Sequence, residues 1–584
     1  MIKARLRGLT AEQSVTGRFL TIKLLKKHCK IKVNKLGNRH IAFLSNITTD
    51  MIKMKLGKSF EVYTPSGFNG WISDVYNSSS FIYDDACEAI IILLDASTFP
   101  EYEQINEELK TWQDAVNNLA ATVSKPILVS TIDVKASKVR TLSEVSYTYE
   151  IQKIWSDFLK ELTDSNKNAY VFDLVEIITD IGRNSFYSQK MLYLGSMPYS
   201  KTGIQAICDE IFLSISNIFD SKKKIIVLDL DNTIWGGVIG EDGIDGIQLS
   251  NHKEGQRFYD FQKQLKRMKE RGVLLAIASK NNEEDVKPVF NLPDMVLKAN
   301  DFVSKKISWD VKSQSIKEIE SELNITEGGF VFIDDNPVER NLVKGECKEV
   351  TVPDFPEDTS TLSTFAEDLY KKCFRLPRLL DEDKKKTEMY FSATKRSEAK
   401  KVCTNLDDYI RSLEINLDIH LMKENEIGRV AQLCSKTNQF NLTTKRYTES
   451  EIESMSKSSD FVIYVASVSD KFGADGLTSV LIIKKEAENL EIDSFLMSCR
   501  VMGRKIENAI INEILNKYRD YKTLIASYIP TSKNKPVENL YEQLGFKLIN
   551  EENGVKSYQT CPNDYKYKQL GIFKNLIFCA GEVK

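Results

Sequence analysis

The chain has 584 residues, of which 42% are hydrophobic and 28% are charged, and its formal net charge is −3. This balance argues against a nucleic-acid-binding protein, and the length predicts three or four domains. No apolar run approaches the roughly 18 residues of a membrane span, and the first residues lack the apolar core of a signal peptide. Ten cysteines without a CxxC pair argue against a zinc site or a disulfide framework. We therefore expect a cytoplasmic protein with neither nucleic-acid nor membrane partners.

Residues 1–220 alternate short apolar runs with helical stretches. The runs, each near a turn signal, cover residues 40–46, 89–97, 125–131 and 169–175. Buried strands that alternate with helices are typical of a parallel sheet. We predict an α/β domain here.

Three further segments follow. Residues 221–356 form a second predicted α/β unit, with apolar strands in KKIIVLDLDNT, GVLLAIASKNN and GGFVFIDDNPVER. Residues 357–412 become charged and helical, which indicates a connector with a solvated face. The pattern of residues 413–584 predicts a unit of both strands and helices, in the order strand, helix, helix, several strands, helix, strand, helix, strand. The expected fold class is therefore multidomain α/β.

Two carboxylates, Asp229 and Asp231, end the first strand of the central unit. Ligands of open α/β sheets bind outside the carboxyl ends of the strands. Carboxylates placed there are costly unless a cation accompanies them, and oxygen ligands beside a phosphate substrate favour Mg²⁺. Asp229 could then attack phosphorus, while Asp231 acts as general acid and then base.

Further candidates follow in chain order. Ser279 ends the next strand, where its hydroxyl could bind the phosphoryl group, and Asp334 and Asp335 end the third strand and could complete the metal shell. Together with Asp229 and Asp231, they make up the predicted metal and phosphate site.

A lysine is expected to hold the phosphate and offset the carboxylates. We favour Lys312 because it begins a helix-like stretch after Trp309. Lys305 and Lys306 are alternatives.

The order and spacing of DLDNT, SKNN, the lysine and FIDD resemble the four motifs of the haloacid dehalogenase (HAD) phosphotransferases. The resemblance implies Asp229 as nucleophile and Thr233, Ser279 and Lys312 as phosphate-binding residues. Only 45 residues separate Thr233 from Ser279, and an independent domain needs roughly 50. We therefore expect a HAD core without a cap domain, and an open site suited to large substrates.

A longer resemblance covers roughly residues 223–550. It is carried by the segments VLDLDNTIWGGVIGEDGIDGIQL, SKNN, FIDDNPVER, KTNQFNLTTKRYT and SFLMSCRVMGR. These segments resemble the FkbH-like proteins, HAD subfamily IIIC, which take the glyceryl group of 1,3-bisphosphoglycerate, remove phosphate and load the acyl unit onto an acyl carrier protein. Glyceryl-loading members tend to carry cysteine before the serine of SKN, where this chain has Ala278. A thioester relay cannot run through alanine; Cys499 is another thiol, but a buried structural cysteine is the simpler interpretation.

The segment SCRVMGRKIENAIINEILNKY (498–518) resembles the pyrophosphate-binding turn and helix of the GNAT acyltransferases. The resemblance implies Arg500 and Gly503 as binding residues for coenzyme A or phosphopantetheine, and Tyr541 as a general-acid candidate. Lys505 stands where that pattern has a small residue. Residues 436–447, rich in amides, hydroxyls and cations, either line the cleft of this domain or form a polar loop. We expect a GNAT-like fold, with acetyl-CoA chemistry the less favoured outcome.

In longer FkbH-like proteins the first unit resembles an SGNH-type hydrolase, which needs serine, histidine and usually aspartate together. The four histidines are His28, His40, His252 and His420, so none lies between residues 41 and 251. Without a local base, Ser45 is poorly placed to attack. We predict a non-catalytic SGNH-like domain, and an exposed loop for His252.

Three functions follow as hypotheses. The first is an FkbH-like phosphatase that acts on a phosphorylated small acid and loads an acyl carrier protein. The second is a stand-alone phosphatase of a sugar or glycan intermediate, which Ala278 favours because it needs no thiol. The third is a GNAT-type acyltransferase with an accessory HAD domain, against which Lys505 argues.

Overall fold

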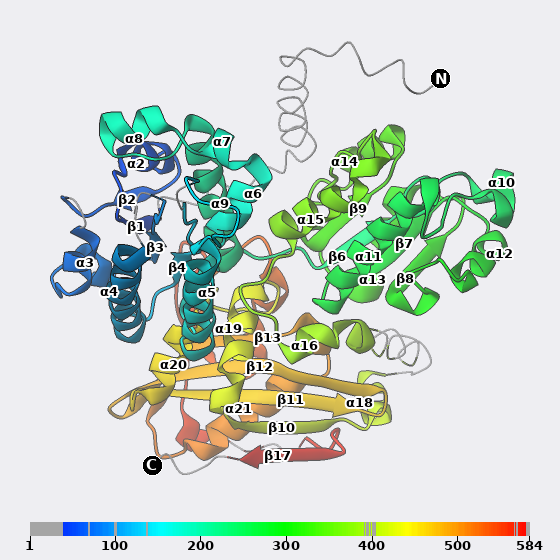
Figure 1. Ribbon diagram of the computed structural model, residues 1–584. Helices are drawn as coiled ribbons and strands as arrows, with labels where there is room; N and C mark the ends of the chain where they lie inside the picture. Colours follow the sequence, from blue (N-terminus) through cyan, green and yellow to red (C-terminus); the bar gives the residue numbers. More distant parts are fainter. Residues whose placement is uncertain are drawn as a thin grey trace.

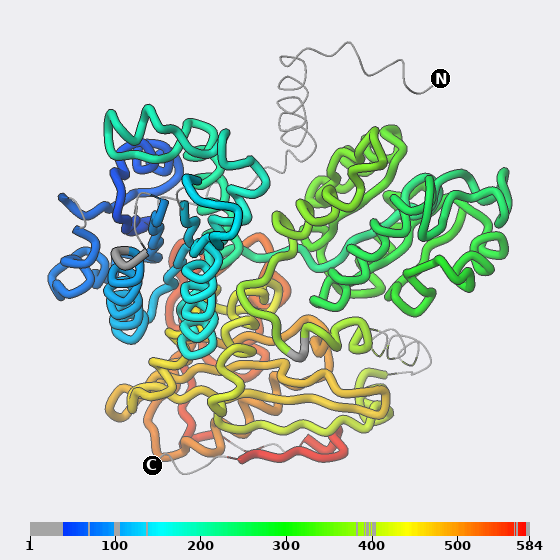
Figure 2. The backbone as a smooth tube through the Cα atoms, viewed as in Figure 1, coloured from blue at the N-terminus to red at the C-terminus, as the bar shows by residue number. Residues whose placement is uncertain are grey.

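The computed structural model shows three units that meet at their edges (Figure 1). The amino-terminal unit (blue to cyan) and the central unit (green) lie side by side, and the carboxyl-terminal unit (yellow to red) lies below both. The smooth backbone trace shows the same arrangement (Figure 2). The structure describes residues 39–579 except 68–69, 98–101, 136–137, 391, 393–395, 397–398, 400–404, 566 and 568–569. His28 lies outside the described residues.

The amino-terminal unit is a parallel sheet with helices on both faces. Its strands are β1 (His40–Ser45), β2 (Glu61–Tyr63), β3 (Ala89–Leu93), β4 (Ile127–Ser130) and β5 (Ala169–Phe172), in the order β2-β1-β3-β4-β5. Its helices are α2 (Asp50–Leu56), α3 (Gly70–Val75), α4 (Tyr102–Thr122), α5 (Thr148–Ser165), α6 (Leu174–Ile181), α7 (Arg183–Phe186), α8 (Gln189–Gly195) and α9 (Lys201–Phe219). The four predicted strands are present. The short edge strand β2 was not predicted.

The central unit is a smaller parallel sheet. Its strands are β6 (Ile225–Leu228), β7 (Leu274–Ser279), β8 (Phe302–Ile307) and β9 (Phe330–Ile333), in the order β8-β7-β6-β9. Its helices are α10 (Ile239–Gly246), α11 (Gln256–Glu270), α12 (Glu283–Val286), α13 (Lys312–Leu323), α14 (Pro337–Glu346) and α15 (Leu362–Cys373). Alternate residues of β6 pack into two hydrophobic cores, because successive side chains of a strand point to opposite faces.

The predicted connector does not begin at residue 357. Helix α15 packs on α11 within the core of the central unit, where the rings of Phe365 and Phe261 lie 6.5 Å apart. Phe365 and Leu369 are spaced i, i+4 and both are buried, so the charged residues around them mark the solvent face of a core helix. The central unit therefore extends to about residue 374.

The carboxyl-terminal unit is built on one mixed sheet. Its strands are β10 (Asn416–Leu421), β11 (Phe461–Asp470), β12 (Gly473–Glu486), β13 (Asn489–Met497), β14 (Thr523–Tyr528), β15 (Lys547–Glu552), β16 (Val555–Thr560) and β17 (Asn575–Cys579), in the order β15-β16-β14-β13-β12-β11-β10-β17. Helices α16 (Asp381–Lys384) and α18 (Leu406–Leu413) precede it, and α19 (Ile427–Lys436), α20 (Glu449–Lys457), α21 (Ile506–Lys517) and α22 (Leu540–Gln543) accompany it.

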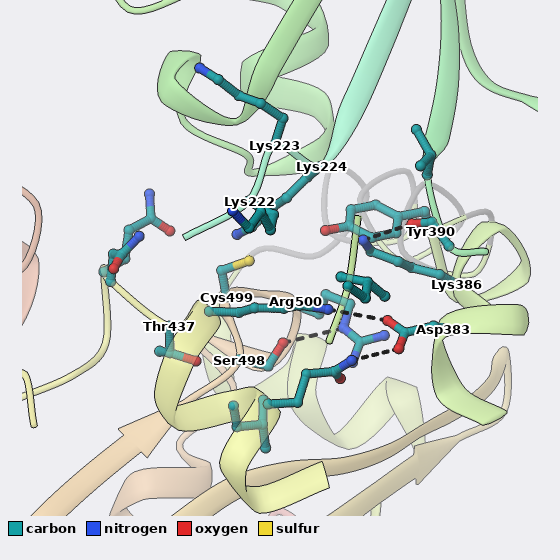
Figure 3. A pocket seen from close by; sticks show the side chains of 18 of the residues that line it. Lys222, Lys223, Lys224, Asp383, Lys386, Tyr390, Thr437, Ser498, Cys499 and Arg500 are labelled. Atoms are coloured by element: carbon teal, nitrogen blue, oxygen red, sulfur yellow. Dashed lines mark hydrogen bonds and ion pairs between the residues drawn. The ribbon is translucent and has the colours of Figure 1, made fainter. Parts of the chain in front are cut away.

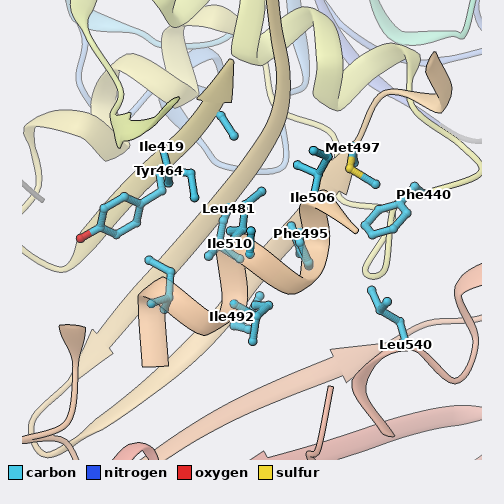
Figure 4. Close-up of a cluster of buried hydrophobic side chains, with 14 of the residues drawn as sticks. Ile419, Phe440, Tyr464, Leu481, Ile492, Phe495, Met497, Ile506, Ile510 and Leu540 are labelled. Carbon is cyan, nitrogen blue, oxygen red and sulfur yellow. The ribbon is translucent and has the colours of Figure 1, made fainter. Parts of the chain in front are cut away.

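Within this sheet, β10 to β13 are antiparallel and β13 pairs with β14 in parallel. Side chains from the strands and from α21 form the core, as Ile492, Phe495 and Ile510 illustrate in Figure 4. The predicted order of strands and helices matches the observed one up to α22, after which three strands (β15, β16 and β17) stand where one was predicted. No helix in the described part of the chain is both long and apolar enough to cross a membrane.

Candidate active site

The carboxyl ends of three strands of the central sheet meet at one edge. Asp229 follows β6, Ser279 ends β7, and Asp334 and Asp335 follow β9. Lys312, the first residue of α13, places its Nζ 2.9 Å from Asp229 Oδ1 and 2.6 Å from Asp334 Oδ2. These five of the seven side chains that the sequence predicts for the site therefore converge.

Three carboxylates gather there with one cation. One carboxylate oxygen from each of Asp229, Asp334 and Asp335 lies within 4.8 Å of the other two. Burial raises the pKa of Asp229 to about 6, with Lys312 opposing the shift and Asp334 adding to it. Burial and the neighbouring Asp334 also raise the pKa of Asp335. Three carboxylates beside one lysine leave two negative charges, which a divalent cation balances, and the hard oxygen donors fit Mg²⁺.

Asp231 stands apart from that group, although the sequence predicts it as a fourth metal ligand. Its Oδ1 accepts hydrogen bonds from Trp235 Nε1 (2.9 Å) and from the amide of Ile239 (3.1 Å). Its Oδ2 accepts one from Asn281 Nδ2 (3.0 Å). These three donors fix the Asp231 carboxylate in the same pocket as Asp229, where it can serve as an acid or base.

The structure gives Thr233 a different role from the predicted phosphate contact. Its hydroxyl is fully buried and accepts a hydrogen bond from the amide of Asp335 (3.2 Å). Thr233 does not line the pocket that holds Asp229 and Ser279. It therefore positions the backbone of Asp335 rather than a substrate.

Asn281 is a site residue that the sequence analysis did not single out. Its Nδ2 donates to Asp231 Oδ2 and, at 3.1 Å, to Ser279 Oγ, so it joins the two strand ends. Arg340 donates to the carbonyl oxygens of Asp334 and Asp335 and fixes their loop. Asn281 and Arg340 belong to the segments SKNN and FIDDNPVER, which were already noted. Their membership in these segments is the sequence signal that could have identified them.

The alternative lysines lie elsewhere. Lys305 Nζ donates to the carbonyl of Ala299 at 3.2 Å, and Lys306 forms half-exposed ion pairs with Glu318 and Glu322. Neither contacts the carboxylates, and the geometry selects Lys312.

The pocket over these residues is open and has a volume of about 340 Å³. Its walls are formed by Asp229, Asp231, Asn232, Ser279, Lys280, Lys312, Asp335, Asn336, Pro337 and Glu339. Between β6 and β7 the chain forms helices α10 and α11, and between β7 and β8 it forms α12 and short 3₁₀ turns, with no separate cap domain in either segment. His252 is exposed and does not line the pocket.

The turn before α21 differs from a phosphate-binding turn in its side chains. Gly503 has φ of +77°, and a Cβ there would meet no atom within 4 Å. Lys505 also has positive φ, and its Nζ pairs with Asp407 Oδ1 at 2.6 Å. The Lys505 side chain therefore points toward α18, and Arg500 lines a cavity shared with the central unit.

Tyr541, the predicted general acid, is a core residue. Its side chain is fully buried and packs against the rings of Phe546 and Tyr558 at 5.2 and 5.5 Å. Burial raises its pKa far above the ordinary value. A hydroxyl that neither reaches a cleft nor ionises cannot transfer a proton to a substrate, so this prediction is wrong.

Residues 440–443 fill the gap between the two parallel strands β13 and β14. The strands pair only from Asn489 to Ile492 of β13 and then diverge. In the divergent part, the amide of Leu442 donates to Phe495 O (3.2 Å), and the amide of Ile529 donates to Leu442 O (2.8 Å). The ring of Phe440 packs edge-on against Phe495 at 5.4 Å (Figure 4). We call residues 440–443 the inserted segment.

The inserted segment removes the place where an extended ligand would bind. A cofactor whose phosphates lay on the turn at 500–505 would extend its arm along the unpaired edges of β13 and β14. Those edges are already bonded to Leu442 and to Phe440, whose carbonyl accepts from the amide of Met497 at 3.0 Å. The predicted cleft-lining role of residues 436–447 is therefore wrong for its central part.

In the amino-terminal unit, Ser45 ends β1 and donates to the carbonyl of Leu93 at 2.5 Å. His40 begins the same strand and is exposed. It is the only histidine in the described residues up to 220, and the length of β1 separates it from Ser45. Among the described residues of this unit, Ser45 therefore has no histidine beside it.

No protein-family model and no curated protein matches the chain. Among solved structures, the chain resembles the amino-terminal part of BF1531 from Bacteroides fragilis, which contains a phosphatase domain and was crystallised with Mg. The match has a TM-score of 0.52 and 26% identity, and covers 61% of this chain and 99% of that one.

Other matches include acetyltransferases that cover about a quarter of this chain. A ribosomal-protein-alanine N-acetyltransferase from Escherichia coli has a TM-score of 0.21, is 9% identical and covers 26% of this chain and 98% of its own. A spermidine N-acetyltransferase from Vibrio cholerae has a TM-score of 0.21, is 14% identical and covers 25% and 94%. The protein is thus a multidomain α/β protein, part of which resembles a solved structure that contains a phosphatase domain.

Metal binding can be tested by thermal unfolding. At a hundredfold excess over its Kd, Mg²⁺ is expected to stabilise the wild-type protein by about 2.7 kcal/mol, and EDTA should reverse the rise in Tm. Asp335→Asn should abolish most of this rise because it removes one carboxylate of the cluster while leaving both ion pairs of Lys312. Asp354→Asn, at a half-exposed surface ion pair, is the matched control. An equal rise in both variants would contradict the assignment.

Proposed function

We propose that the protein is a Mg²⁺-dependent phosphatase of the HAD type, with Asp229 as nucleophile. The observation that carries the proposal is the convergence of three carboxylates and Lys312 at the carboxyl edge of a parallel sheet. Within that group, Lys312 holds Asp229 at hydrogen-bond distance and so keeps it ionised for attack.

In the first step, an Asp229 oxygen bonds to phosphorus and the bond from phosphorus to the leaving oxygen breaks. Asp231, in its protonated form, gives its proton to the leaving oxygen. Water then attacks the phosphorus of the aspartyl-phosphate, and Asp231 takes the proton from it, so that inorganic phosphate leaves and Asp229 is regenerated. Bound Mg²⁺ supplies positive charge to the phosphate oxygens. Lys312 and Ser279 contribute a cation and a hydroxyl on the protein side of the same pocket.

The open pocket supports a substrate whose phosphate is presented from outside the domain. The walls of the pocket come from strand ends and adjoining loops, and no separate cap covers it. The charge of the site does not distinguish among a phosphate at the end of a sugar, of a glycan or of an acyl group. We therefore propose a phosphorylated small molecule or an exposed phosphorylated group as the substrate class.

A second candidate is transfer of the acyl unit to an acyl carrier protein. It is supported by the resemblance to FkbH-like proteins and by an open site that a carrier-bound arm could reach. Ala278 argues against a thioester relay, because it is fully buried beside Ser279 and no cysteine lines the pocket. Cys499 lines a different cavity.

One assay separates the two candidates. The protein is incubated with Mg²⁺, 1,3-bisphosphoglycerate and a phosphopantetheinylated carrier protein, and both phosphate release and the mass of the carrier are followed. Phosphate release without a gain in carrier mass would rule out loading and keep the phosphatase. A gain in mass that depends on Asp229 would establish the second candidate.

The acyltransferase hypothesis requires the inserted segment to leave the gap between β13 and β14. From the burial of Leu442 we expect the segment to stay in place. Leu442 is fully buried, so Leu442→Ala is expected to destabilise the carboxyl-terminal unit by about 2–5 kcal/mol. Thermal unfolding measures this loss, and Leu548→Ala, at a position 44% exposed in the same unit, is the control. If both variants lost little stability and the protein bound acetyl-CoA, the inserted segment would be a movable lid.

A further inference from the structure

A strongly basic cavity lies where the central unit, the segment after it and the carboxyl-terminal unit meet (Figure 3). Its volume is about 100 Å³, and eight of its 24 lining residues are Lys or Arg, whereas one, Asp383, is acidic. The basic side chains come from the residues before β6, from the residue after α11, from the segment after α16, from α19 and from the turn after β13. The nucleophile pocket shares none of these residues.

Lys386 is one of the cavity cations that form no ion pair with a carboxylate in the described residues. Its Nζ donates to the carbonyl of Gly272 at 2.8 Å, and within the described part of the chain no carboxylate lies within ion-pair distance of it. Burial, together with the positive charge of Lys436, lowers the pKa of Lys386 to about 7, and Asp383 opposes this shift. In Figure 3 its side chain extends along the cavity beside Tyr390 and Arg500.

The single acid cannot neutralise the other cations. Asp383 accepts hydrogen bonds from Gln432 (2.5 Å) and Lys436 (3.3 Å). Burial nevertheless lowers the pKa of Lys436 to about 8 and that of Lys222 to about 8. Within the described residues, the ammonium group of Lys222 has one hydrogen-bond acceptor, the carbonyl oxygen of Ser216. Gathering like charges away from water is costly unless a counter-charge binds among them.

We propose that this cavity binds a phosphate group. Several lysines and the guanidinium of Arg500 converge on one small volume, which favours a compact dianion over a single carboxylate. Ser498, Thr437 and Asn438 add uncharged polar groups to the same walls. The ligand is a free phosphate ion or the phosphoryl end of a small molecule, and it would join the central and carboxyl-terminal units through ionic contacts.

This site is distinct from the nucleophile pocket. Lys222 to Lys224 enter β6 and Asp229 leaves it, so the length of the strand, about 13 Å for four residues, separates the two ends. The inference does not depend on the proposed phosphatase activity, and a variant of the nucleophile can distinguish the two sites.

The test is calorimetric titration of the full-length protein, in EDTA, with inorganic phosphate and with pyrophosphate. One ion should bind per chain, and Lys386→Gln should weaken binding at least tenfold. The neighbouring exposed residue provides the matched control, since Lys385→Gln should bind as tightly as wild type. Asp229→Asn should also bind normally. Pyrophosphate binding at least tenfold tighter than phosphate would indicate a diphosphate ligand, and equal affinities a single phosphoryl group.

Two results would overturn the proposal. The first is a titration in which the wild-type protein binds neither ion, or in which Lys386→Gln binds phosphate as tightly as the wild type does. The other is binding that Asp229→Asn changes tenfold or more in either direction, which would place the ion in the nucleophile pocket, where Asp229 lies beside Lys312. Should Lys386→Gln not fold, Lys224→Gln changes another wall of the cavity and gives the same readout.

Discussion

Asp229→Asn is expected to lower kcat for phosphate release by about 10⁴-fold or more, because an amide cannot attack phosphorus. The substitution conserves the shape of a side chain that is almost completely buried. It also removes one of three crowded carboxylates, so the folded protein should lose no stability. Release of phosphate from acetyl phosphate or p-nitrophenyl phosphate with saturating Mg²⁺ measures the effect.

The matched control is Asp245→Asn, an exposed aspartate on α10, which should keep wild-type kcat. A trapped phosphorylated intermediate would be seen in wild type by mass spectrometry and be missing from the Asp229 variant. More than one hundredth of wild-type kcat in Asp229→Asn, with no loss in its Mg²⁺ response, would mean that another group attacks phosphorus.

Lys312→Met is expected to have two effects. Activity should fall by about 10²–10³-fold, because the cation that faces the phosphoryl group is lost. Stability should fall by about 3–5 kcal/mol in the absence of metal, because Asp229 and Asp334 are then buried without their partner. Unfolding in urea and kcat measured on the same preparation report the two effects.

Added Mg²⁺ should recover part of the stability of Lys312→Met but little of its activity, since the metal replaces charge and not the position of the ammonium group. Lys306→Met is the control, because its ion pairs are half-exposed and such pairs contribute about 0–1 kcal/mol. If Lys312→Met and Lys306→Met lost the same amount of stability, the buried ion pairs of Lys312 would contribute no more than the half-exposed pairs of Lys306.

The sequence predicted those parts of the fold that depend on local patterns. Strands β6, β7 and β9 are short and apolar up to the polar residue that ends or follows each of them, so Asp229, Ser279 and Asp334 could be placed at one sheet edge before any contact was known. Lys312 was placed correctly because the helix-like stretch after Trp309 does begin a helix at this residue. The absence of a cap followed from the number of residues between the motifs.

The rest depends on contacts between distant parts of the chain. The hydroxyl of Thr233 bonds to the amide of Asp335, which belongs to another strand end, and its neighbours in the sequence do not show this. Tyr541 lies on a four-residue helix, too short for its periodicity to show which face is buried. The charged residues of α15 indicated a solvated connector, so the buried apolar stripe of this helix, which includes Phe365, was not recognised from the sequence.

The inserted segment was the least predictable element, because its partners on β13 and near Ile529 lie far along the chain from Leu442. It also affects how the carboxyl-terminal unit unfolds. Two strands that diverge would leave a seam at which the sheet could open into halves, and each half could exchange its amide hydrogens independently. With Leu442 bonded to both sides, the seam is closed by backbone hydrogen bonds and buried apolar side chains. The two halves should therefore show the same hydrogen-exchange protection and lose it together, as one cooperative unit.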